Sequence, residues 1–406
     1  MSTLKVGALQ GISASSDAIT LANDGTCTAN ITNNLSNRNL AINGVDMMVA
    51  QRGTSTTGLQ NAGGIYTIDR FAYRRFGTWS NAIFKHEQVN SGTGLFKKAL
   101  KVTTTTAEGS SATGDEAVMI GHYLEAQDTI AAFGDGTAEA KSFTVSFYVK
   151  ASIATTYSLH LSTAHLTTEK AYVAPFTVNS TNTWERKTIT FPAITNSIST
   201  VDGADISSGI RFHWVLDAAT GSNSPNTYIN YVSGDFKYPT GQSPSGFANT
   251  LNATFQLSGV QIEAGSVATD LEHRSFAQEL ALCQRYCVSY LQTDNKIINI
   301  FGGSRGSTYK WFTMDLPSPM RADPTVTRVG NVRVGTYNNS YEEATDTLTV
   351  GGVTPTVALV EPANDKLIIF YLGSISGMSN SANITYILMF TSSTSGGNRL
   401  TLDAEL

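Results

Sequence analysis

An alternation of apolar and polar residues is the feature that most restricts what this chain can fold into. Within residues 142–150, the apolar side chains Phe143, Val145, Phe147 and Val149 alternate with Thr, Ser, Tyr and Lys. A period of two belongs to a β-strand with one buried face, whereas a helix repeats about every 3.6 residues. Further strand-like segments, bounded by turn residues, follow at 157–161, 186–191, 210–216, 227–232 and 254–263. We therefore expect an all-β chain in which residues 40–274 form a jelly-roll β-sandwich.

The last of these segments changes phase at a glycine. Phe255 and Leu257 lie on one side of Gly259, and Val260 and Ile262 lie on the other side, one residue out of step. An extra residue in a strand produces this shift, and glycine is the residue that bulges favour. We expect a β-bulge at Gly259, or a strand that changes neighbours there.

The composition excludes several classes of protein. Only 15% of the 406 residues are charged, against about a quarter in an average soluble protein, and small Ser, Thr and Gly residues replace them. A net charge of −5 argues against nucleic-acid binding, which needs clustered Lys and Arg. No apolar run approaches the roughly 20 residues that cross a bilayer, so we expect neither membrane insertion nor a secretion signal. Three cysteines are too few for a disulfide framework, as in a protein made in a reducing cytoplasm.

The segments on either side of the sandwich read differently. Residues 1–39 contain short β-type runs without an aromatic residue, so we expect an extended N-terminal arm held by another chain or by copies of itself. Ser275 and Gln278 have the spacing of a capping box, which predicts a helix from Phe276 to Tyr290 within a connecting segment, 275–292. Residues 293–406 return to strand patterns and are expected to form a smaller C-terminal β-sandwich.

Two blocks of sequence frame the expected jelly roll. The opening block comprises Asn39–Gly44, Ala50–Ser55 and Tyr66–Phe71, and the closing block comprises Leu257–Gly265, Ala268–Ser275 and Glu279–Tyr286. Together they resemble the ends of a domain in a family of bacteriophage tail-fibre and other virion fibre proteins. The arm segments Thr3–Val6 and Ala22–Thr26 and the later segment Pro319–Val326 are similar to further parts of such proteins. Where the family has a second aromatic after Tyr286, this chain has Cys287.

The resemblance implies a virion structural protein whose jelly roll is similar to carbohydrate-binding modules. Such a tail fibre, or fibre-like appendage of a tailed phage, is made in the host cytoplasm and assembles into the virion as a homotrimer. Residues 1–39 would bind a tail, collar or capsid protein, and the fibre would contact host-surface polysaccharide. A glycan-binding adhesin is the alternative function, and a polysaccharide depolymerase is a further one.

Candidate binding residues are of three kinds. Sugars stack on aromatic rings, which are dense at both ends of the sandwich sequence, and the candidates there are Tyr66, Tyr73, Trp79, Trp214 and Tyr228. Other rings in the same clusters are Phe71, Phe76, Tyr231 and Tyr238. A structural calcium is typical of the modules that the chain resembles, and Asp46 and Asp235 are its candidate ligands. One helix face carries the candidate trimer contacts: Phe276, Leu280, Cys283 and Cys287.

Catalytic patterns are weak. Gly302–Gly306 matches a nucleophile elbow around Ser304, but a strand pattern follows it where that motif needs a helix. Adjacent acids such as Asp115 and Glu116 point to opposite faces of a strand, so they make a poor glycosidase pair. His160 and His165 lack a convincing zinc spacing. We therefore expect no enzyme and no cofactor other than calcium.

Overall fold

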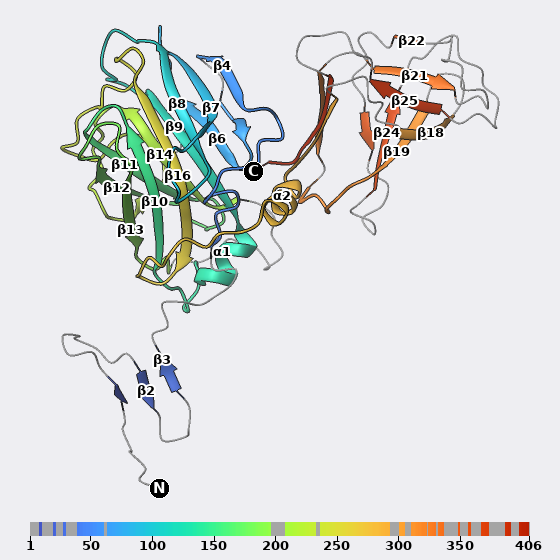
Figure 1. Cartoon of the computed structure of the whole chain (residues 1–406). Coiled ribbons are helices and arrows are strands. Elements are labelled where there is room, and N and C mark those ends of the chain that lie inside the picture. Colours follow the sequence, from blue (N-terminus) through green and yellow to red (C-terminus); the bar gives the residue numbers. More distant parts are fainter. Residues whose placement is uncertain are drawn as a thin grey trace.

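The computed structural model consists almost entirely of antiparallel β-sheets (Figure 1). It describes residues 8–9, 19–21, 27–29, 39–60, 63–195, 208–232, 236–292, 300–304, 310–322, 324–329, 332–336, 348–349, 356–358, 367–372, 386–390 and 398–405. Within these residues the chain forms five sheets and two helices. The all-β expectation is confirmed.

Two sheets pack face to face as the jelly-roll sandwich. The six-stranded sheet has the order β13 (Glu185–Phe191), β10 (Phe143–Ala151), β16 (Thr254–Ala264), β8 (Lys98–Thr106), β7 (Ile83–Asn90) and β4 (Ser55–Leu59). The seven-stranded sheet has the order β15 (Ile229–Asn230), β12 (Lys170–Thr177), β11 (Thr156–Thr163), β14 (Ser208–Ala218), β9 (Ala117–Glu125), β6 (Phe71–Phe76) and β5 (Ile65–Ile68). The predicted jelly roll is thus confirmed.

Aromatic rings from both sheets fill the sandwich core. Phe143 of the six-stranded sheet stacks on Phe191, with ring centroids 5.2 Å apart, and meets Phe212 of the other sheet edge-on at 6.3 Å. Phe147 contacts Trp214 in the same way at 5.7 Å. Offset and edge-to-face pairs of this kind add to the free energy gained by burying the rings. The alternation that predicted β10 therefore corresponds to its buried face.

The predicted bulge at Gly259 is present. The pairing of β10 with β16 shifts register between Ser146 and Tyr148, and Gly259 has a φ of 60°. Leu257 before the bulge and Val260 after it both reach the core. The extra residue therefore keeps the apolar side chains on one face of the strand although the sequence changes phase.

The structure contains a helix that we did not predict. Helix α1 (Ala126–Phe133) follows β9 directly and ends at Gly134, which has a left-handed φ of 63°. Only Ala126, Thr129 and Phe133 are buried, and Phe133 stacks on Phe143 at 4.5 Å. Eight residues with one large apolar contact give too short a periodic signal to recognise in the sequence.

Helix α2 starts where the capping box predicts but ends earlier. It spans Phe276–Gln284, and the reciprocal hydrogen bonds of Ser275 and Gln278 are both present. The predicted extension to Tyr290 is wrong, because Cys287 begins strand β17 (Cys287–Gln292), which pairs with β26 (Asn398–Asp403). Segment 275–292 is therefore half helix and half strand. Pairing with a strand more than a hundred residues away outweighs the local helical pattern.

The C-terminal part of the chain adds two further antiparallel sheets. One has the order β17, β26 and β20 (Thr325–Val329). The other has the order β22 (Leu348–Thr349), β21 (Val332–Thr336), β25 (Tyr386–Phe390), β18 (Ile300–Ser304), β19 (Lys310–Asp315), β24 (Leu367–Leu372) and β23 (Thr356–Ala358). The domain boundaries at residues 39, 274 and 292, and the second sandwich, stay predictions.

Charged side chains join the sheet of β17, β26 and β20 to the jelly roll. The Arg52 guanidinium donates to Asp403, with Nη2 2.9 Å from Oδ2, and buried Arg70 pairs with Glu405 at the end of the described chain. Arg285, just after α2, donates two hydrogen bonds of 2.8 Å to Glu125 of β9. The C-terminal strand is thereby anchored to the first strands of the sandwich.

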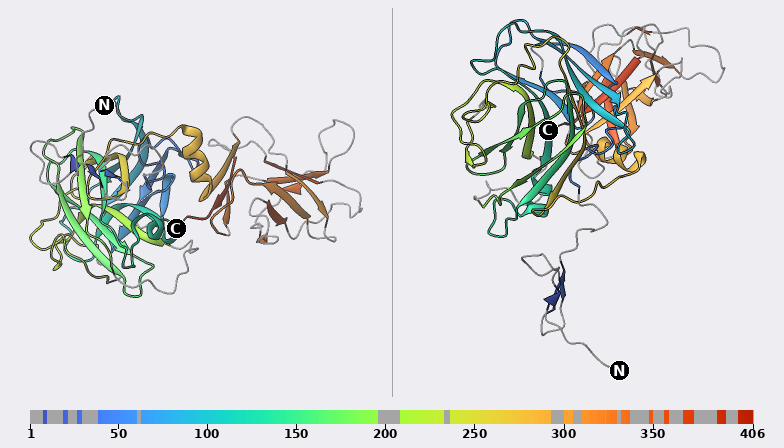
Figure 2. Two further views of the ribbon diagram at one scale, coloured as in Figure 1. Left: turned by 90° about the horizontal axis from the view of Figure 1, so that it is seen from below. Right: turned by 60° about the vertical axis from the view of Figure 1, so that its left-hand side comes forward.

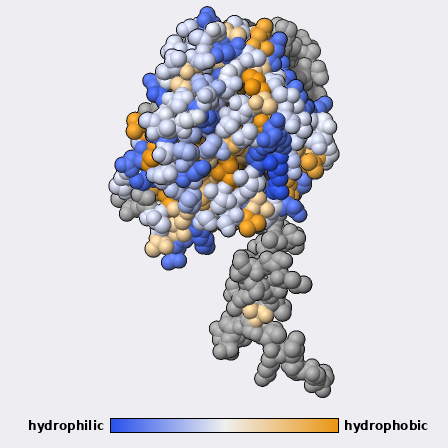
Figure 3. Space-filling model, turned by 90° about the vertical axis from the view of Figure 1, so that its left-hand side faces the viewer, coloured by the Kyte–Doolittle hydropathy of each residue, from blue (hydrophilic) through white to orange (hydrophobic). Residues whose placement is uncertain are grey.

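The remaining strands form a small sheet near the N-terminus. It consists of β1 (Ala8–Leu9), β2 (Ile19–Leu21) and β3 (Cys27–Ala29), and it lies apart from the sandwich in the right view of Figure 2. On the face of the sandwich turned away from the C-terminal sheets, apolar atoms are scattered among polar ones (Figure 3). Among the described residues, no helix has the length and apolar character that crossing a membrane requires.

Candidate binding pocket on the seven-stranded sheet

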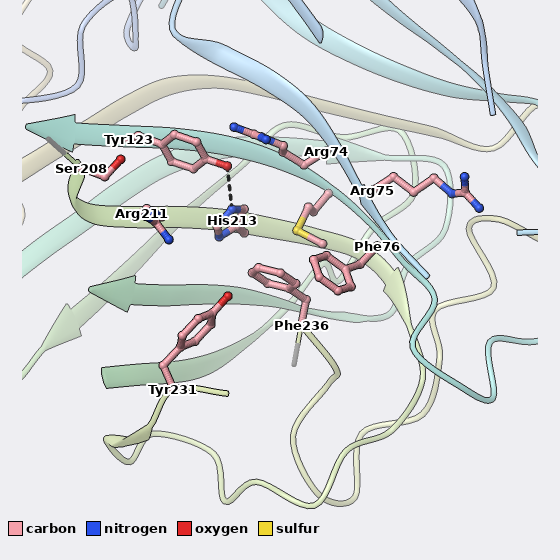
Figure 4. A pocket seen from close by; sticks show the side chains of 10 residues that line it. Arg74, Arg75, Phe76, Tyr123, Ser208, Arg211, His213, Tyr231 and Phe236 are labelled. Carbon is pink, nitrogen blue, oxygen red and sulfur yellow. Dashed lines mark hydrogen bonds between the residues drawn. The ribbon is translucent and has the colours of Figure 1, made fainter. Parts of the chain in front are cut away.

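A pocket of about 320 Å³ lies on the outer face of the seven-stranded sheet (Figure 4). Strands β6, β9 and β14 supply its floor, with Arg74, Met119, Tyr123 and His213 among the lining residues. Their sequence neighbours Tyr73, Ile120 and Trp214 belong to the sandwich core. Because successive side chains of a strand point to opposite faces, burying one set places the other set outside.

Strand register brings these residues together from distant parts of the sequence. Arg74 lies opposite Met119, Tyr123 lies opposite Arg211, and Gly121 lies opposite His213. A Cβ atom at Gly121 would lie 3.1 Å from the Tyr123 hydroxyl and 3.3 Å from Cγ of Arg74. The missing side chain thus leaves room for Tyr123 and Arg74 to lie across the sheet beside His213.

A hydrogen bond joins the two titratable rings on the floor. The Tyr123 hydroxyl is 3.1 Å from Nε2 of His213. Burial, reinforced by His160 and two arginines, holds the pKa of His213 well below its ordinary value, and burial raises the pKa of Tyr123. Both rings are therefore uncharged near neutral pH. Nδ1 of His213 is buried without a hydrogen-bond partner among the described residues.

Aromatic rings form one wall of the pocket. Phe76 lies against Phe236, with ring centroids 4.9 Å apart, and Tyr231 meets Phe236 edge-on at 6.3 Å. Figure 4 shows the two phenylalanines ring to ring, with the Tyr231 hydroxyl directed toward His213. Phe236, Met119 and Tyr238 also belong to a small apolar cluster outside the main core. This wall offers flat apolar surface beside the hydrogen-bonding groups of the floor.

Three arginines supply the charge of the pocket. The Arg74 guanidinium carbon lies 4.9 Å from the centroid of the Tyr123 ring, a cation–π distance. Arg75 and Arg211 also line the pocket, and none of the described lining residues is an aspartate or glutamate. The described lining of the pocket therefore carries positive charge on a chain whose net charge is negative.

Most of the aromatic residues predicted as sugar platforms are buried. Tyr73, Trp79 and Trp214 are at most 1% exposed, and Tyr66 is 7% exposed. Their prediction as platforms is wrong, because they point into the sandwich or beneath neighbouring side chains, where no sugar can stack. Tyr228 is half-buried, donates its hydroxyl to the Pro192 carbonyl at 2.9 Å and packs on Tyr172, and its role stays a prediction.

The pocket uses other members of the same aromatic clusters. Phe76 and Tyr231 line it, three residues after Tyr73 and three residues after Tyr228. The arginines and His213 were not candidates from the sequence. If Trp214 is known to be buried, the alternation of side chains along the strand places His213 and Arg211 on the outer face. The sequence alone does not say whether Trp214 or His213 is the buried ring.

The predicted trimer contacts are only partly at the surface. Cys283 and Cys287 are both fully buried within the chain, so their prediction as contacts between copies is wrong. Cys283 lies on the inner face of α2, and Cys287 lies in β17. Phe276 is 51% exposed and Leu280 is half-buried, and their assembly role stays a prediction.

The described residues contain no group of three or more His, Cys, Asp and Glu side chains arranged to hold a metal. Asp46 accepts a hydrogen bond from the Lys97 amide at 3.0 Å and faces His273 at 3.2 Å. Asp235 lies outside the described residues, so calcium stays a prediction. His160 and His165 have different neighbours, since His160 packs on Phe236 at 5.1 Å and His165 lies 2.7 Å from Asp135.

Ser304 does not sit in a nucleophile elbow. It ends strand β18 and lies opposite Lys310 of β19, so the next element among the described residues is a strand, whereas the motif needs a helix. Gly302, Gly303 and Ser304 therefore belong to a pair of antiparallel strands.

Comparisons with known proteins give structural likenesses only. No protein-family model matches the chain, and no curated protein matches its sequence. A family 11 carbohydrate-binding module from Clostridium thermocellum, in complex with a mixed-linked tetrasaccharide, is similar at 13% identity and a TM-score of 0.26, covering 54% of this chain and 99% of the module. A xylan-binding domain from Paenibacillus barcinonensis is similar at 10% identity and a TM-score of 0.26, covering 57% of this chain and 99% of the domain.

One phage protein is among the similar structures. The enzymatically active domain of bacteriophage CBA120 tailspike protein 4 is similar at 11% identity and a TM-score of 0.28, and the match covers 58% of this chain and 24% of that one. The function of the present chain is therefore argued from its own pocket.

Proposed function

We propose that the chain is a carbohydrate-binding protein that holds a glycan in the pocket lined by Arg74, Tyr123, His213 and Phe236. The observation that carries the proposal is the combination of an aromatic wall and a polar floor in one open pocket. A sugar ring has apolar C–H faces that stack on aromatic rings and hydroxyls that exchange hydrogen bonds. The volume of about 320 Å³ falls in the range of roughly 300–1,000 Å³ found for small-molecule sites.

The same pocket favours binding over catalysis. Glycoside cleavage generally uses two carboxyl groups on either side of the bond, and none of the described residues that line this pocket carries one. We therefore assign it a recognition role and rank depolymerase activity behind it.

The test is binding of host-surface polysaccharides by Phe76→Ala. This residue is 36% exposed at the pocket wall, so removing its ring removes stacking surface without opening the core. We expect about a tenfold loss of affinity, or about 1.4 kcal/mol, in affinity electrophoresis or calorimetry. Leu251→Ala is the matched control, because Leu251 is 58% exposed and does not line the pocket. Equal binding by the two variants would rule out this pocket as the glycan site.

We further propose that glycan binding serves host attachment by a fibre-like virion appendage, as the two sequence blocks imply. The chain would assemble as a homotrimer, with residues 1–39 bound to a tail, collar or capsid protein. The exposed Phe276 side chain on α2 is available for contact between copies. Multi-angle light scattering of the purified chain should give a mass near three times 43.4 kDa. A stable monomer at micromolar concentration would refute the trimer.

A further inference from the structure

The charge of the pocket differs from that of the chain around it. The whole chain has 27 Lys and Arg residues against 32 Asp and Glu residues, yet the described residues that line this pocket include three arginines and no acid. A neutral sugar needs no cation, because its hydroxyls bind equally well to amides, carboxylates and hydroxyls. The concentration of guanidinium groups therefore points to a ligand with negative charge.

Arg74 and Arg211 are available to such a ligand. Neither Arg74 nor Arg211 forms an ion pair with a carboxylate of the described residues. Nε of Arg74 is buried without a hydrogen-bond partner among those residues. A buried donor without a partner carries a desolvation cost that a bound acceptor would remove. By contrast, Arg285 outside the pocket is paired with Glu125 through two hydrogen bonds.

The geometry of the floor suits an oxyanion. Arg74 comes from β6 and Arg211 from β14, on either side of β9, so the two guanidinium groups approach the Tyr123 ring from neighbouring strands. A guanidinium binds a carboxylate or sulfate through two parallel N–H donors, and this pairing is stronger where water is partly excluded. The aromatic wall of Phe76 and Phe236 would then hold the ring of the same sugar residue.

We infer that the pocket selects an acidic glycan, in which a carboxylate or sulfate of one sugar residue pairs with Arg74 and Arg211 while its ring packs on Phe76 and Phe236. This inference rests on the proposed carbohydrate binding and specifies the class of sugar. Carboxylate and sulfate share the chemistry that the arginines recognise, so the experiment includes both.

The experiment compares acidic and neutral members of three polysaccharide pairs. The probes are polygalacturonate and its full methyl ester, carboxymethylcellulose and hydroxyethylcellulose, and dextran sulfate and dextran. Affinities of the full chain are measured by affinity electrophoresis at low and high salt. We expect the acidic member of at least one pair to bind at least tenfold more tightly, with an affinity that falls as salt is raised.

Variants separate the pocket from general charge. Arg211→Gln should abolish the preference for the acidic member, and Arg211→Lys should retain part of it, because lysine keeps the charge without the two parallel donors. Arg186→Gln is the matched control, since Arg186 is exposed on β13 of the other sheet. It should keep the preference, and thermal melting should show that all variants are folded.

The outcomes distinguish this inference from the proposed function. Equal affinity for both members of every pair would overturn the acidic-glycan inference while leaving carbohydrate binding intact. A preference that Arg186→Gln reduces as much as Arg211→Gln would overturn it as well, since the selectivity would then come from general surface charge. Binding to none of the six probes would overturn both proposals.

Discussion

At the scale of single residues, buried histidines make the fold sensitive to acid. His86 of β7 is fully buried, and burial lowers its pKa from 6.5 to about 3. Neither of its ring nitrogens has a hydrogen-bond partner among the described residues. A folded-state pKa below the unfolded value means that the unfolded chain binds the proton first as pH falls. The stability that depends on neutral His86 is therefore fully present above about pH 6.5, and it is lost progressively as the pH falls toward 3.

The variant His86→Leu should remove this share of the acid sensitivity. We expect its free energy of unfolding to stay close to that of the parent at pH 7 and to exceed it by on the order of 3 kcal/mol at pH 4. Urea denaturation at both pH values measures the difference. His122 has a similarly lowered pKa, of about 3, but Nδ1 lies 3.1 Å from the Arg70 carbonyl. Because His122→Leu removes this hydrogen bond, it should lower the free energy of unfolding by about 1 kcal/mol at pH 7, unlike His86→Leu. A parent-like pH slope in His86→Leu would contradict the account.

At the scale of elements, the bulge in β16 depends on one glycine. Gly259 has a left-handed φ of 60°, and a Cβ there would lie 2.7 Å from Cδ2 of Tyr148 in the paired strand. Both backbone conformation and space therefore favour glycine at this position. The bulge keeps Leu257 and Val260 on the core side, so its loss would turn half of the strand outward.

Three Gly→Ala variants separate these effects. Gly94 has open space around it and no left-handed φ, so Gly94→Ala should leave the free energy of unfolding nearly unchanged. Gly92 has open space around it but a φ of 72°, so Gly92→Ala should lower the free energy of unfolding by about 1 kcal/mol. Gly259→Ala combines strain with a close contact and should cost more, about 2–3 kcal/mol. Urea unfolding midpoints give the order, and equal costs for Gly92→Ala and Gly259→Ala would show that the Tyr148 contact relaxes freely.

At the scale of the whole molecule, the C-terminal strand is coupled to the sandwich by buried charge. Arg70 is 2% exposed, pairs with Glu405, donates to the Tyr123 carbonyl, and lies 3.5 Å from the centroid of the Tyr286 ring. Removing one member of such a pair leaves the other charge buried without compensation. Residues 398–405 are thus coupled to the jelly roll although β26 belongs to another sheet.

The variant Glu405→Gln should therefore destabilise the protein by about 3–5 kcal/mol, measured by chemical denaturation followed by tryptophan fluorescence. Asp115→Asn is the matched control, because Asp115 pairs with Lys237 at 3.2 Å while its side chain is 72% exposed. An exposed pair of this kind contributes at most about 1 kcal/mol. Similar small losses in both variants would show that Arg70 finds water or another acceptor when Glu405 is neutral.

The local features of this protein can be predicted from its amino-acid sequence. Alternation in residues 142–150 predicted β10, the phase change at Gly259 predicted the bulge, and the Ser275 capping box predicted the start of α2. Each of these depends on neighbours in sequence, through side-chain period, backbone φ or a hydrogen bond across one helical turn.

The pocket, by contrast, depends on contacts between distant parts of the chain. Trp214 and His213 are adjacent, and a shift of one residue in register would exchange their faces, so burial of the tryptophan can be known only from what packs on it. Arg74, Tyr123 and Arg211 meet because β9 pairs with β6 and β14, and α2 stops because Cys287 pairs opposite Asp403. These contacts join residues far apart in the chain, so their energies do not appear in any local pattern.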